Sequence, residues 1–167
     1  MNTKQLLKYS LFDGLDESEL NQFLNIIDNK KYKANNIIIN ENEDGDSVML
    51  LLDGTVTISK ALTIKIDQIE QPEKEFTKLN ANQYPFFGEV SIFNPSNKRT
   101  ATIIADTNCT IGILKNKNLI KVCEDNAEIG YKIMKNISKK LINDLLITNR
   151  QVLKLTTAFS LIIEKQH

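Results

Sequence analysis

The spacing of hydrophobic positions along the chain changes twice and divides the sequence into three regions. Over residues 3–28 apolar residues recur every three or four positions, as on one face of a helix. Residues 30–115 instead contain short runs rich in β-branched residues, separated by turn-forming residues, which predicts strands. From about residue 116 the helical spacing returns and continues almost to the end. The order of helices, strands and helices favours an α+β fold.

The N-terminal region predicts two short helical segments. Asp16 or Ser18 can cap the second, because a side-chain oxygen there accepts from a free amide of the first turn. The apolar positions that continue this second segment are Leu20, Phe23, Leu24 and Ile27. A helix that reaches Ile27 is therefore expected.

The central region predicts a core built of strands. Its strand-like runs are residues 37–39, 48–52, 55–58, 62–66, 76–79, 102–105 and 110–114. Asp53-Gly54 is a hairpin signal, because glycine takes the positive φ that a tight turn needs. Gly45 is interpreted in the same way, as a glycine that only makes a turn. Many short strands at roughly even spacing predict a sandwich or a jelly-roll barrel.

The C-terminal region predicts one long helix that carries a seam for a partner. After Asp125-Asn126 no proline interrupts the pattern, and only Gly130 weakens it. Spacings of four, three, four and three, the repeat of a coiled coil, join Leu141, Leu145, Thr148, Val152 and Leu155. Because this seam continues past the length that one small barrel can cover, we expect a homodimer through this helix. Packing of the helix onto its own barrel is the alternative.

Charge and composition exclude several classes of function. Lys and Arg together number 21, as do Asp and Glu, so no overall field attracts nucleic acid or an anionic membrane. No stretch resembles a signal peptide or reaches the roughly 20 apolar residues of a membrane span. We therefore expect a cytoplasmic protein with neither a membrane nor a nucleic acid as partner. Cys109 and Cys123 are interpreted as buried thiols.

The single histidine, His167, is the last residue. A metal-binding barrel normally uses several histidines, and a nucleophile activated by histidine needs one inside the fold. The sequence also lacks a P-loop, a nucleophile elbow and a kinase signature. It therefore predicts neither a metal site nor an enzyme.

One segment combines groups that suit a phosphate next to a sugar. Phe87-Gly88-Glu89-Val90 is followed, ten residues after its glutamate, by Arg99-Thr100-Ala101-Thr102. A guanidinium forks to phosphate oxygens, amides at a glycine-opened turn bind anions, and a carboxylate accepts from a sugar hydroxyl. Because Arg99 enters a strand-like run, its burial would demand a partner. The pattern indicates an anion-binding loop.

This segment, FGEVSIFNPSNKRTATI, resembles the phosphate-binding cassette of the cyclic-nucleotide-binding domain family. The stretch from Asn42 to Ser47, with LLLDGTV after it, is similar to a second family pattern, with Asn42 in place of a glycine. The approach to the cassette departs from the family because it lacks the usual Gly-Asp. The resemblance implies a β jelly-roll barrel with N-terminal helices over residues 1–125. Residues 126–167 would form a long C-terminal helix that serves in dimerisation and as a lid.

The resemblance also assigns roles within the cassette. It implies that Arg99 pairs with the cyclic phosphate and that Glu89 accepts a hydrogen bond from the ribose 2′-hydroxyl. Gly88 would let the backbone come close, and the amides of Val90 and Ser91 would point at the phosphate. The cassette residues that the resemblance implies as ligand-binding are Phe87, Gly88, Glu89, Val90, Ser91, Arg99, Thr100 and Ala101.

The purine end of the site is less defined. In the bacterial activators of the family, the long helix brings a Thr-Ser pair to the base, one residue coming from the partner subunit. LLITNRQVLKL is similar to that stretch and places Thr148 and Asn149 there. Alternatively, Thr148 only sets the register of the coiled coil. Thr100 offers a hydroxyl beside the phosphate that permits both cAMP and cGMP, so the choice of base stays open.

Together these features predict a stand-alone regulatory module that binds cAMP or cGMP and signals by moving its C-terminal helix. Its output would need an effector protein that the sequence does not identify. In the bacterial transcription factors this helix continues into a DNA-binding domain, and the twelve residues after Leu155 are too few for one. The alternative is a ligand-free dimeric scaffold of the same fold, in which Arg99 and Glu89 pair with each other or with backbone. Retention of both residues weighs against that alternative.

Overall fold

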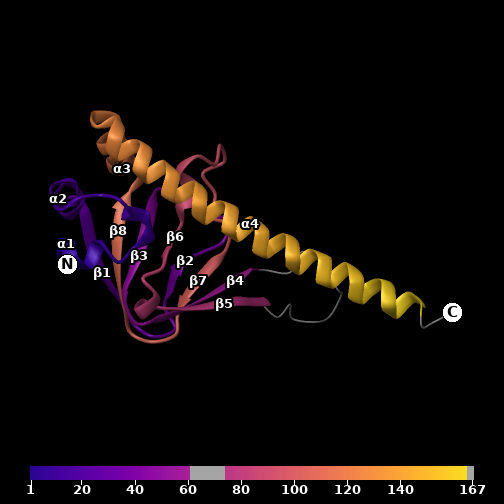
Figure 1. Ribbon diagram of the computed structural model, residues 1–167. Helices are drawn as coiled ribbons and strands as arrows, with labels where there is room; N and C mark the ends of the chain where they lie inside the picture. The colour runs from indigo at the N-terminus through magenta and orange to yellow at the C-terminus, as the bar shows by residue number, and fades with distance from the viewer. Residues whose placement is uncertain (61–73, 165–167) are drawn as a thin grey trace.

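The computed structural model describes residues 1–60 and 74–164, in which two four-stranded antiparallel sheets pack face to face (Figure 1). The first sheet contains, from edge to edge, β1 (Ile27–Tyr32), β8 (Cys109–Lys115), β3 (Ser47–Asp53) and β6 (Phe86–Phe87). The second contains β2 (Ile37–Ile39), β7 (Thr102–Ala105), β4 (Thr55–Lys60) and β5 (Lys74–Asn80). Each sheet combines strands from early and late in the chain, as in a jelly roll. The predicted fold class is confirmed.

Helices precede, interrupt and follow the barrel. They are α1 (Thr3–Leu6), the 3-10 turn η1 (Ser10–Phe12), α2 (Glu17–Leu24), the 3-10 turns η2 (Ala81–Gln83) and η3 (Glu89–Ile92), α3 (Asn116–Asp125) and α4 (Ala127–Glu164). Figure 1 shows α4 crossing one side of the barrel and continuing well beyond it toward the C-terminus. The long C-terminal helix expected from the sequence is therefore present.

The sequence pattern located most of the strands but missed two. The predicted run at 62–66 lies outside the described residues, and the other six runs fall within observed strands. The expectation that Ile27 ends a helix is wrong, because α2 stops at Leu24 and Ile27 begins β1. β1 is an edge strand whose central residues are polar and exposed, so no alternation of apolar residues marks it. β6 has two residues, too few to show any period.

Two hydrophobic cores hold the fold together. One packs the N-terminal helices and the first half of α4 against the first sheet, and it includes the fully buried Phe12, Phe23 and Ile133. The other lies between the sheets and includes Leu51 and Cys109. Burial of a side chain of this size contributes roughly 1.5–3 kcal/mol. The first core therefore fixes where α4 begins its path across the barrel.

Polar contacts add to the anchoring of α4. The side-chain amide of Asn136, 5% exposed, donates to the carbonyl oxygens of Leu11 and Asp13 at 3.1 and 2.9 Å. Lys132 lies 2.8 Å from the Glu19 carboxylate. These contacts set the rotation of α4 and so determine which of its side chains face the barrel.

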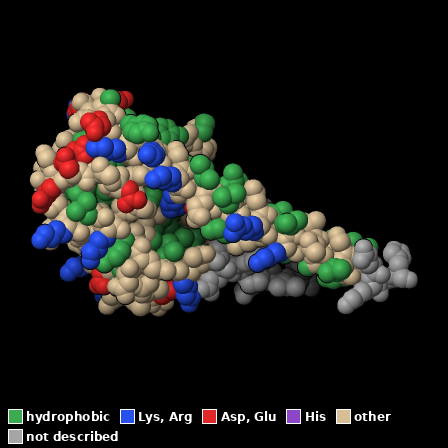
Figure 2. All heavy atoms as spheres, in the orientation of Figure 1, with side chains coloured by type: hydrophobic (Ala, Val, Ile, Leu, Met, Phe, Trp, Pro, Cys, Tyr) green, Lys and Arg blue, Asp and Glu red, His purple; other side chains and the backbone are tan. Residues whose placement is uncertain are grey.

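The second half of α4 has no such partner within the described chain. Every residue from 141 to 163 is exposed, including the predicted seam. The same spacing continues through Phe159 and Ile162, which are 66% and 57% exposed. Figure 2 shows hydrophobic side chains distributed along this projecting part of the helix. Among the described residues, no helix has the length and the hydropathy to cross a membrane.

Candidate functional site

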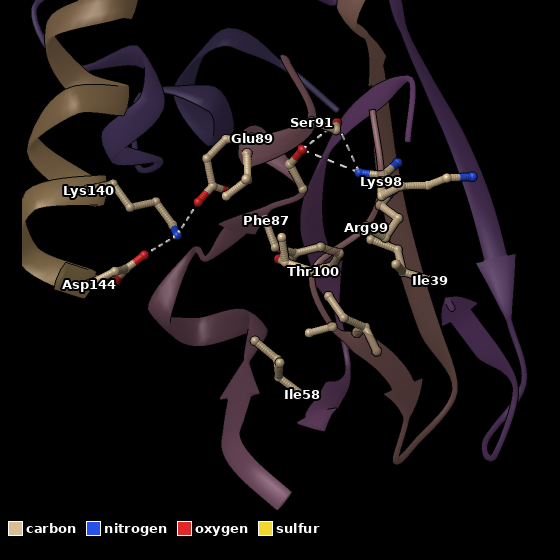
Figure 3. A pocket seen from close by; sticks show the side chains of 14 residues that line it. Ile39, Ile58, Phe87, Glu89, Ser91, Lys98, Arg99, Thr100, Lys140 and Asp144 are labelled. Atoms are coloured by element: carbon tan, nitrogen blue, oxygen red, sulfur yellow. Dashed lines mark hydrogen bonds and ion pairs between the residues drawn. The ribbon is translucent and has the colours of Figure 1, made fainter. Parts of the chain in front are cut away.

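A cavity of about 190 Å³ lies between the second sheet, the segment that follows β6 and the middle of α4 (Figure 3). Its wall brings together the eight cassette residues that the sequence singled out, Phe87, Gly88, Glu89, Val90, Ser91, Arg99, Thr100 and Ala101. Lys140 and Asp144 of α4 complete the wall on the helix side. The site is thus formed by segments about fifty residues apart in the sequence.

Two glycines make room for the central arginine. Gly88 has a φ of 84°, a left-handed conformation, and a Cβ at this position would collide with the guanidinium of Arg99. A Cβ on Gly45 would come within 2.6 Å of Arg99 Nε and 2.8 Å of Ser91 Cβ. The interpretation of Gly45 as a turn residue alone is therefore wrong. Its lack of a side chain is required for the packing of Arg99.

Arg99 is a buried cation held by neutral groups. It is 7% exposed, and its Nη1 donates to the carbonyl oxygens of Ser47 at 2.9 Å and Gly88 at 3.3 Å. Nη2 donates to Ser47 Oγ at 3.1 Å, and Nη1 lies 3.4 Å from Ser91 Oγ. In residues 1–60 and 74–164, no carboxylate lies within salt-bridge distance of the guanidinium. A buried charge without a counter-ion is costly, so the site favours an incoming anion.

The surroundings of Arg99 affect its pKa in two directions. Burial lowers the pKa of the guanidinium, and the more distant carboxylates of Asp46, Glu89 and Glu43 oppose that effect. The net shift is downward. Because the ordinary pKa of arginine lies above about 12, the group is positive throughout the physiological range.

Glu89 is connected to the long helix by an ion pair. Its side chain is 4% exposed, and its Oε1 lies 2.6 Å from Lys140 Nζ (Figure 3). The same ammonium lies 2.7 Å from Asp144 Oδ2. Burial alone would lower the pKa of Lys140, but the two carboxylates outweigh it and raise that pKa. Lys140 is therefore a charged bridge between the cassette and α4.

Lys140 and Asp144 are site residues that the sequence analysis missed. The available signal was their i, i+4 spacing on one face of the helix. That spacing alone indicates a surface ion pair, and no local pattern joins Glu89 to a lysine fifty residues later. The contact depends on how the first core orients α4.

A larger groove of about 670 Å³ adjoins the cavity. The residues that line both are Ile58, Phe87, Thr100, Ala101, Lys140 and Asp144. Beyond them the groove is walled by apolar side chains such as Leu79 and Phe86 and by the outer turns of α4. The combined site has a cationic end at Arg99 and a wider end between β5 and α4, which both apolar and polar side chains line.

The two helix residues expected at the purine lie farther out. Thr148 lines the groove but not the cavity, and its Oγ1 donates to the carbonyl oxygen of Asp144 at 2.9 Å. Asn149 is exposed and lines neither space. The polar residues of α4 that line the cavity are Lys140 and Asp144, and Asp144 lies one turn before Thr148. In the cassette, the backbone amide of Ser91 is one of the two amides expected to point at the phosphate. In the structure it donates to the carbonyl oxygen of Gly88 at 3.2 Å.

The described residues of the site do not form a cluster of metal ligands. In the described part of the chain, no three His, Cys, Asp or Glu side chains lie close enough together to hold a metal ion. The groups present are a fixed cation, a buried carboxylate and an apolar wall. This arrangement can bind an anion that carries a hydroxyl and a flat apolar part.

Comparisons with known proteins agree with this geometry. The family model described as "Cyclic nucleotide-binding domain" matches residues 29–126. The chain is 31% identical over 125 residues to the cAMP-activated global transcriptional regulator CRP of Haemophilus influenzae, covering 75% of this chain and 50% of the relative. It is 30% identical over 100 residues to a cGMP-dependent protein kinase of Caenorhabditis elegans, covering 60% of this chain and 12% of the kinase. The chain thus spans about half the length of the regulator and a small part of the kinase.

Solved structures show the same fold. A cyclic nucleotide-binding domain from Methylobacillus flagellatus superposes with a TM-score of 0.74 at 18% identity, covering 90% of this chain and 80% of that one. The regulatory domain of Toxoplasma gondii PKA with cAMP gives 0.69 at 22% identity, covering 86% and 49%. Fold, cassette geometry and family match all agree, and the chain belongs to the cyclic nucleotide-binding domain family.

Proposed function

We propose that this chain is a regulatory module that binds a cyclic nucleotide, cAMP or cGMP, in the cavity at Arg99. The observation that carries the proposal is the buried guanidinium of Arg99, which has neutral hydrogen-bond partners and no carboxylate at salt-bridge distance among the described residues. A cyclic phosphate would supply the missing negative charge and the two oxygens that a guanidinium fork fits.

The rest of the ligand fits the two ends of the site. Glu89 lies on the same wall as Arg99, where its carboxylate can accept from a ribose hydroxyl. The adjoining groove, with its apolar wall of Leu79 and Phe86, suits a planar base. A related regulatory domain has been solved with cAMP, and related proteins are named for activation by cAMP and dependence on cGMP.

Signalling would run through the bridge between Glu89 and Lys140. A ribose hydroxyl that donates to Glu89 competes with Lys140 for the same carboxylate. Since Lys140 belongs to α4, ligand binding would change how the helix is held against the barrel. A ligand shifts such an equilibrium only by the difference in its affinity for the two helix positions. The effector that reads the helix position would be another cytoplasmic protein.

The exposed half of α4 would join two copies of the chain. Its seam is apolar at six of seven positions from Leu141 to Ile162, with Thr148 as the polar one. These side chains are exposed in the single chain, and the seam has the heptad spacing with which a second identical helix can interdigitate. A homodimer would bury the seam and place Thr148 at the border of the groove and the interface.

A ligand-free scaffold remains the second candidate, and one observation favours it. Among the described residues, the guanidinium of Arg99 donates only to Ser47, Gly88 and Ser91, so the arginine holds the cassette together without a ligand. In that function Arg99 would be structural and the cavity would bind nothing. The dimer seam serves either function equally.

Calorimetric titration with cAMP and cGMP separates the two candidates. The protein is first unfolded and refolded to remove any carried-over nucleotide. We expect micromolar or tighter binding of at least one nucleotide. Arg99→Ala should lose it by more than a hundredfold, because the charge-assisted pairs to the phosphate are removed.

A matched control for that variant is Lys121→Ala, which removes one positive charge from an exposed pair with Asp125 on α3. It should bind like the unmodified protein. Thermal unfolding of all three proteins verifies that Arg99→Ala is folded. Absence of heat with both nucleotides in the folded, stripped protein would favour the scaffold.

A further inference from the structure

Ser91 lies between the anion cavity and a second hollow behind the cassette. That hollow has a volume of about 510 Å³, and Ser91 and Asn116 are among the residues that line it. Ser91 also lines the anion cavity and is only 2% exposed. Asn116 is the first residue of α3, so the back of the cassette lies against the start of that helix. The contact between these two residues connects the anion cavity to α3.

The hydroxyl group of Ser91 is fully used by its neighbours. It donates to the Gly88 carbonyl oxygen at 2.8 Å, and it accepts from Arg99 Nη1 at 3.4 Å and from Asn116 Nδ2 at 3.3 Å. A serine hydroxyl has one hydrogen and two lone pairs. Since the short bond to Gly88 takes the hydrogen, a donor of Asn116 must face the oxygen. Asn116 therefore helps to set the direction in which this hydroxyl accepts from Arg99.

The hydroxyl belongs to a set of acceptors that hold one nitrogen of Arg99. Among the described residues, Nη1 donates to the carbonyl oxygens of Ser47 and Gly88 and to the Ser91 hydroxyl. Nη2 donates to the Ser47 hydroxyl. A guanidinium has five N–H donors in one plane, so donors on Nη2 and Nε are left for an anion in the cavity. The groups that hold Nη1 thus also set the direction of the donors that would meet a phosphate.

Asn116 holds both segments that surround Arg99. Its backbone amide donates to the carbonyl oxygen of Asp46 at 2.7 Å, directly before Ser47, and its side chain donates to Ser91. In the described part of the chain, its Oδ1 is buried and has no hydrogen-bond partner. A buried oxygen without a partner lowers stability. The stability of α3 alone therefore does not account for an asparagine at this position.

We propose that Asn116 is a positioning residue for phosphate binding, which acts on Arg99 through the hydroxyl group of Ser91. The inference rests on the proposed function and adds the start of α3 to the phosphate end of the site. The loss of one such hydrogen bond corresponds to about a three- to tenfold loss of affinity. The alternative is that Asn116 only packs α3 against the cassette.

A double-mutant cycle tests this route, with calorimetric titration of cAMP and cGMP as the measurement. Asn116→Ala and Ser91→Ala should each weaken nucleotide binding by about three- to tenfold. The variant that carries both substitutions should bind as Ser91→Ala does, because the route from Asn116 to Arg99 is already cut. A purely structural role of Asn116 would not depend on the presence of the Ser91 hydroxyl.

Asn116→Asp is the second variant, because it keeps the shape of the side chain and lacks its donors. Its new charge acts both with and without Ser91→Ala, so the cycle still isolates the hydrogen bond. Asn118→Ala is the matched control, since Asn118 is the same type of residue on the same helix and lines neither the cavity nor the hollow. It should bind like the unmodified protein. Urea unfolding verifies that each variant is folded.

The proposal is overturned if folded Asn116→Ala binds the nucleotide like the unmodified protein, or if Ser91→Ala does. It is also overturned if the losses of the two single variants multiply in the double variant, since the two residues then act independently. Any of these results leaves the proposed function intact, because the unmodified protein still binds the nucleotide. Binding of neither nucleotide by the stripped, folded, unmodified protein overturns both.

Discussion

At the scale of single residues, the site depends on space and charge around Arg99. The guanidinium fills the volume that Gly45 and Gly88 leave free, and its partners are backbone and hydroxyl oxygens. The sequence indicated Arg99 and Glu89 because their motif has a known chemistry. A glycine is needed at position 45 because it packs against Arg99, which lies 54 residues later in the chain. The local sequence indicates only a turn at that position.

Gly45→Ala should lower nucleotide affinity by about tenfold or more, because the new methyl group would displace Arg99 and Ser91. Gly14→Ala is the control. Gly14, unlike Gly45, has a positive φ, and a Cβ there meets nothing within 4 Å. Calorimetric titration should show that Gly14→Ala keeps the nucleotide affinity of the unmodified protein. The positive φ at this position should lower only the stability of the fold. Equal affinity of both variants would contradict the packing argument.

The buried Tyr9 gives the fold a measurable sensitivity to alkali. Its side chain is fully buried, and its hydroxyl donates to the Leu51 carbonyl at 2.7 Å. Burial, with a smaller effect of Tyr84, raises the pKa of Tyr9 to about 12. An unfolded chain has a tyrosine pKa near 10, so the fold favours the neutral phenol. This contribution is complete below pH 10 and is lost as the pH rises toward 12.

Tyr9→Phe should cost about 1 kcal/mol at pH 7, because one buried hydrogen bond is lost. Urea unfolding at pH 7, 10 and 11.5 should show the difference shrinking as the pH rises, since the variant lacks this ionisation. A difference that stays constant over the whole range would show that Tyr9 does not titrate with unfolding.

At the scale of elements, the site exists because α4 is rotated to present Lys140 and Asp144 to the cassette. Strands with β-branched runs and the long helix could be predicted, because their periods are local. β1 could not be predicted, because an exposed edge strand shows no alternation of apolar residues. The ion pair between Glu89 and Lys140 could not be predicted either, because it depends on how α4 packs against the barrel. Sequence patterns thus predicted most of the helices and strands, whereas tertiary contacts determine which turn of α4 lines the cavity.

Asn136 is the polar anchor of that rotation. Asn136→Ala removes the donors to the carbonyl oxygens of Leu11 and Asp13 and should lower the free energy of unfolding by about 1–3 kcal/mol. Asn149→Ala, at an exposed position of the same helix, should stay within about 0.5 kcal/mol of the unmodified protein. Urea denaturation measures both. Equal stability of the two variants would show that Asn136 does not anchor α4.

At the scale of the whole molecule, the barrel contains the candidate site, and the second half of α4 is an exposed helix that carries a line of apolar side chains. The barrel supplies most of the cavity wall, and α4 carries both Lys140 and Asp144 of that wall and the seam that we propose for a second copy. The proposed ligand recognition and the proposed assembly would therefore be linked through one helix.

Leu155→Asp should convert the proposed dimer to a monomer, because a carboxylate would be placed in the apolar seam. Leu161→Asp introduces the same charge off the seam on the same exposed helix and should leave the dimer intact. Sedimentation velocity at micromolar concentration distinguishes the two. If the unmodified protein is a monomer at this concentration, the proposed homodimer is wrong.

A crystal structure of the protein with saturating cyclic nucleotide would show whether the phosphate of the nucleotide binds to Arg99. We expect phosphate oxygens within hydrogen-bonding distance of the Arg99 guanidinium, the ribose hydroxyl on Glu89 and the base in the groove between β5 and α4. The proposed function would be contradicted by a nucleotide bound elsewhere, or by an Arg99 guanidinium that still donates only to Ser47, Gly88 and Ser91.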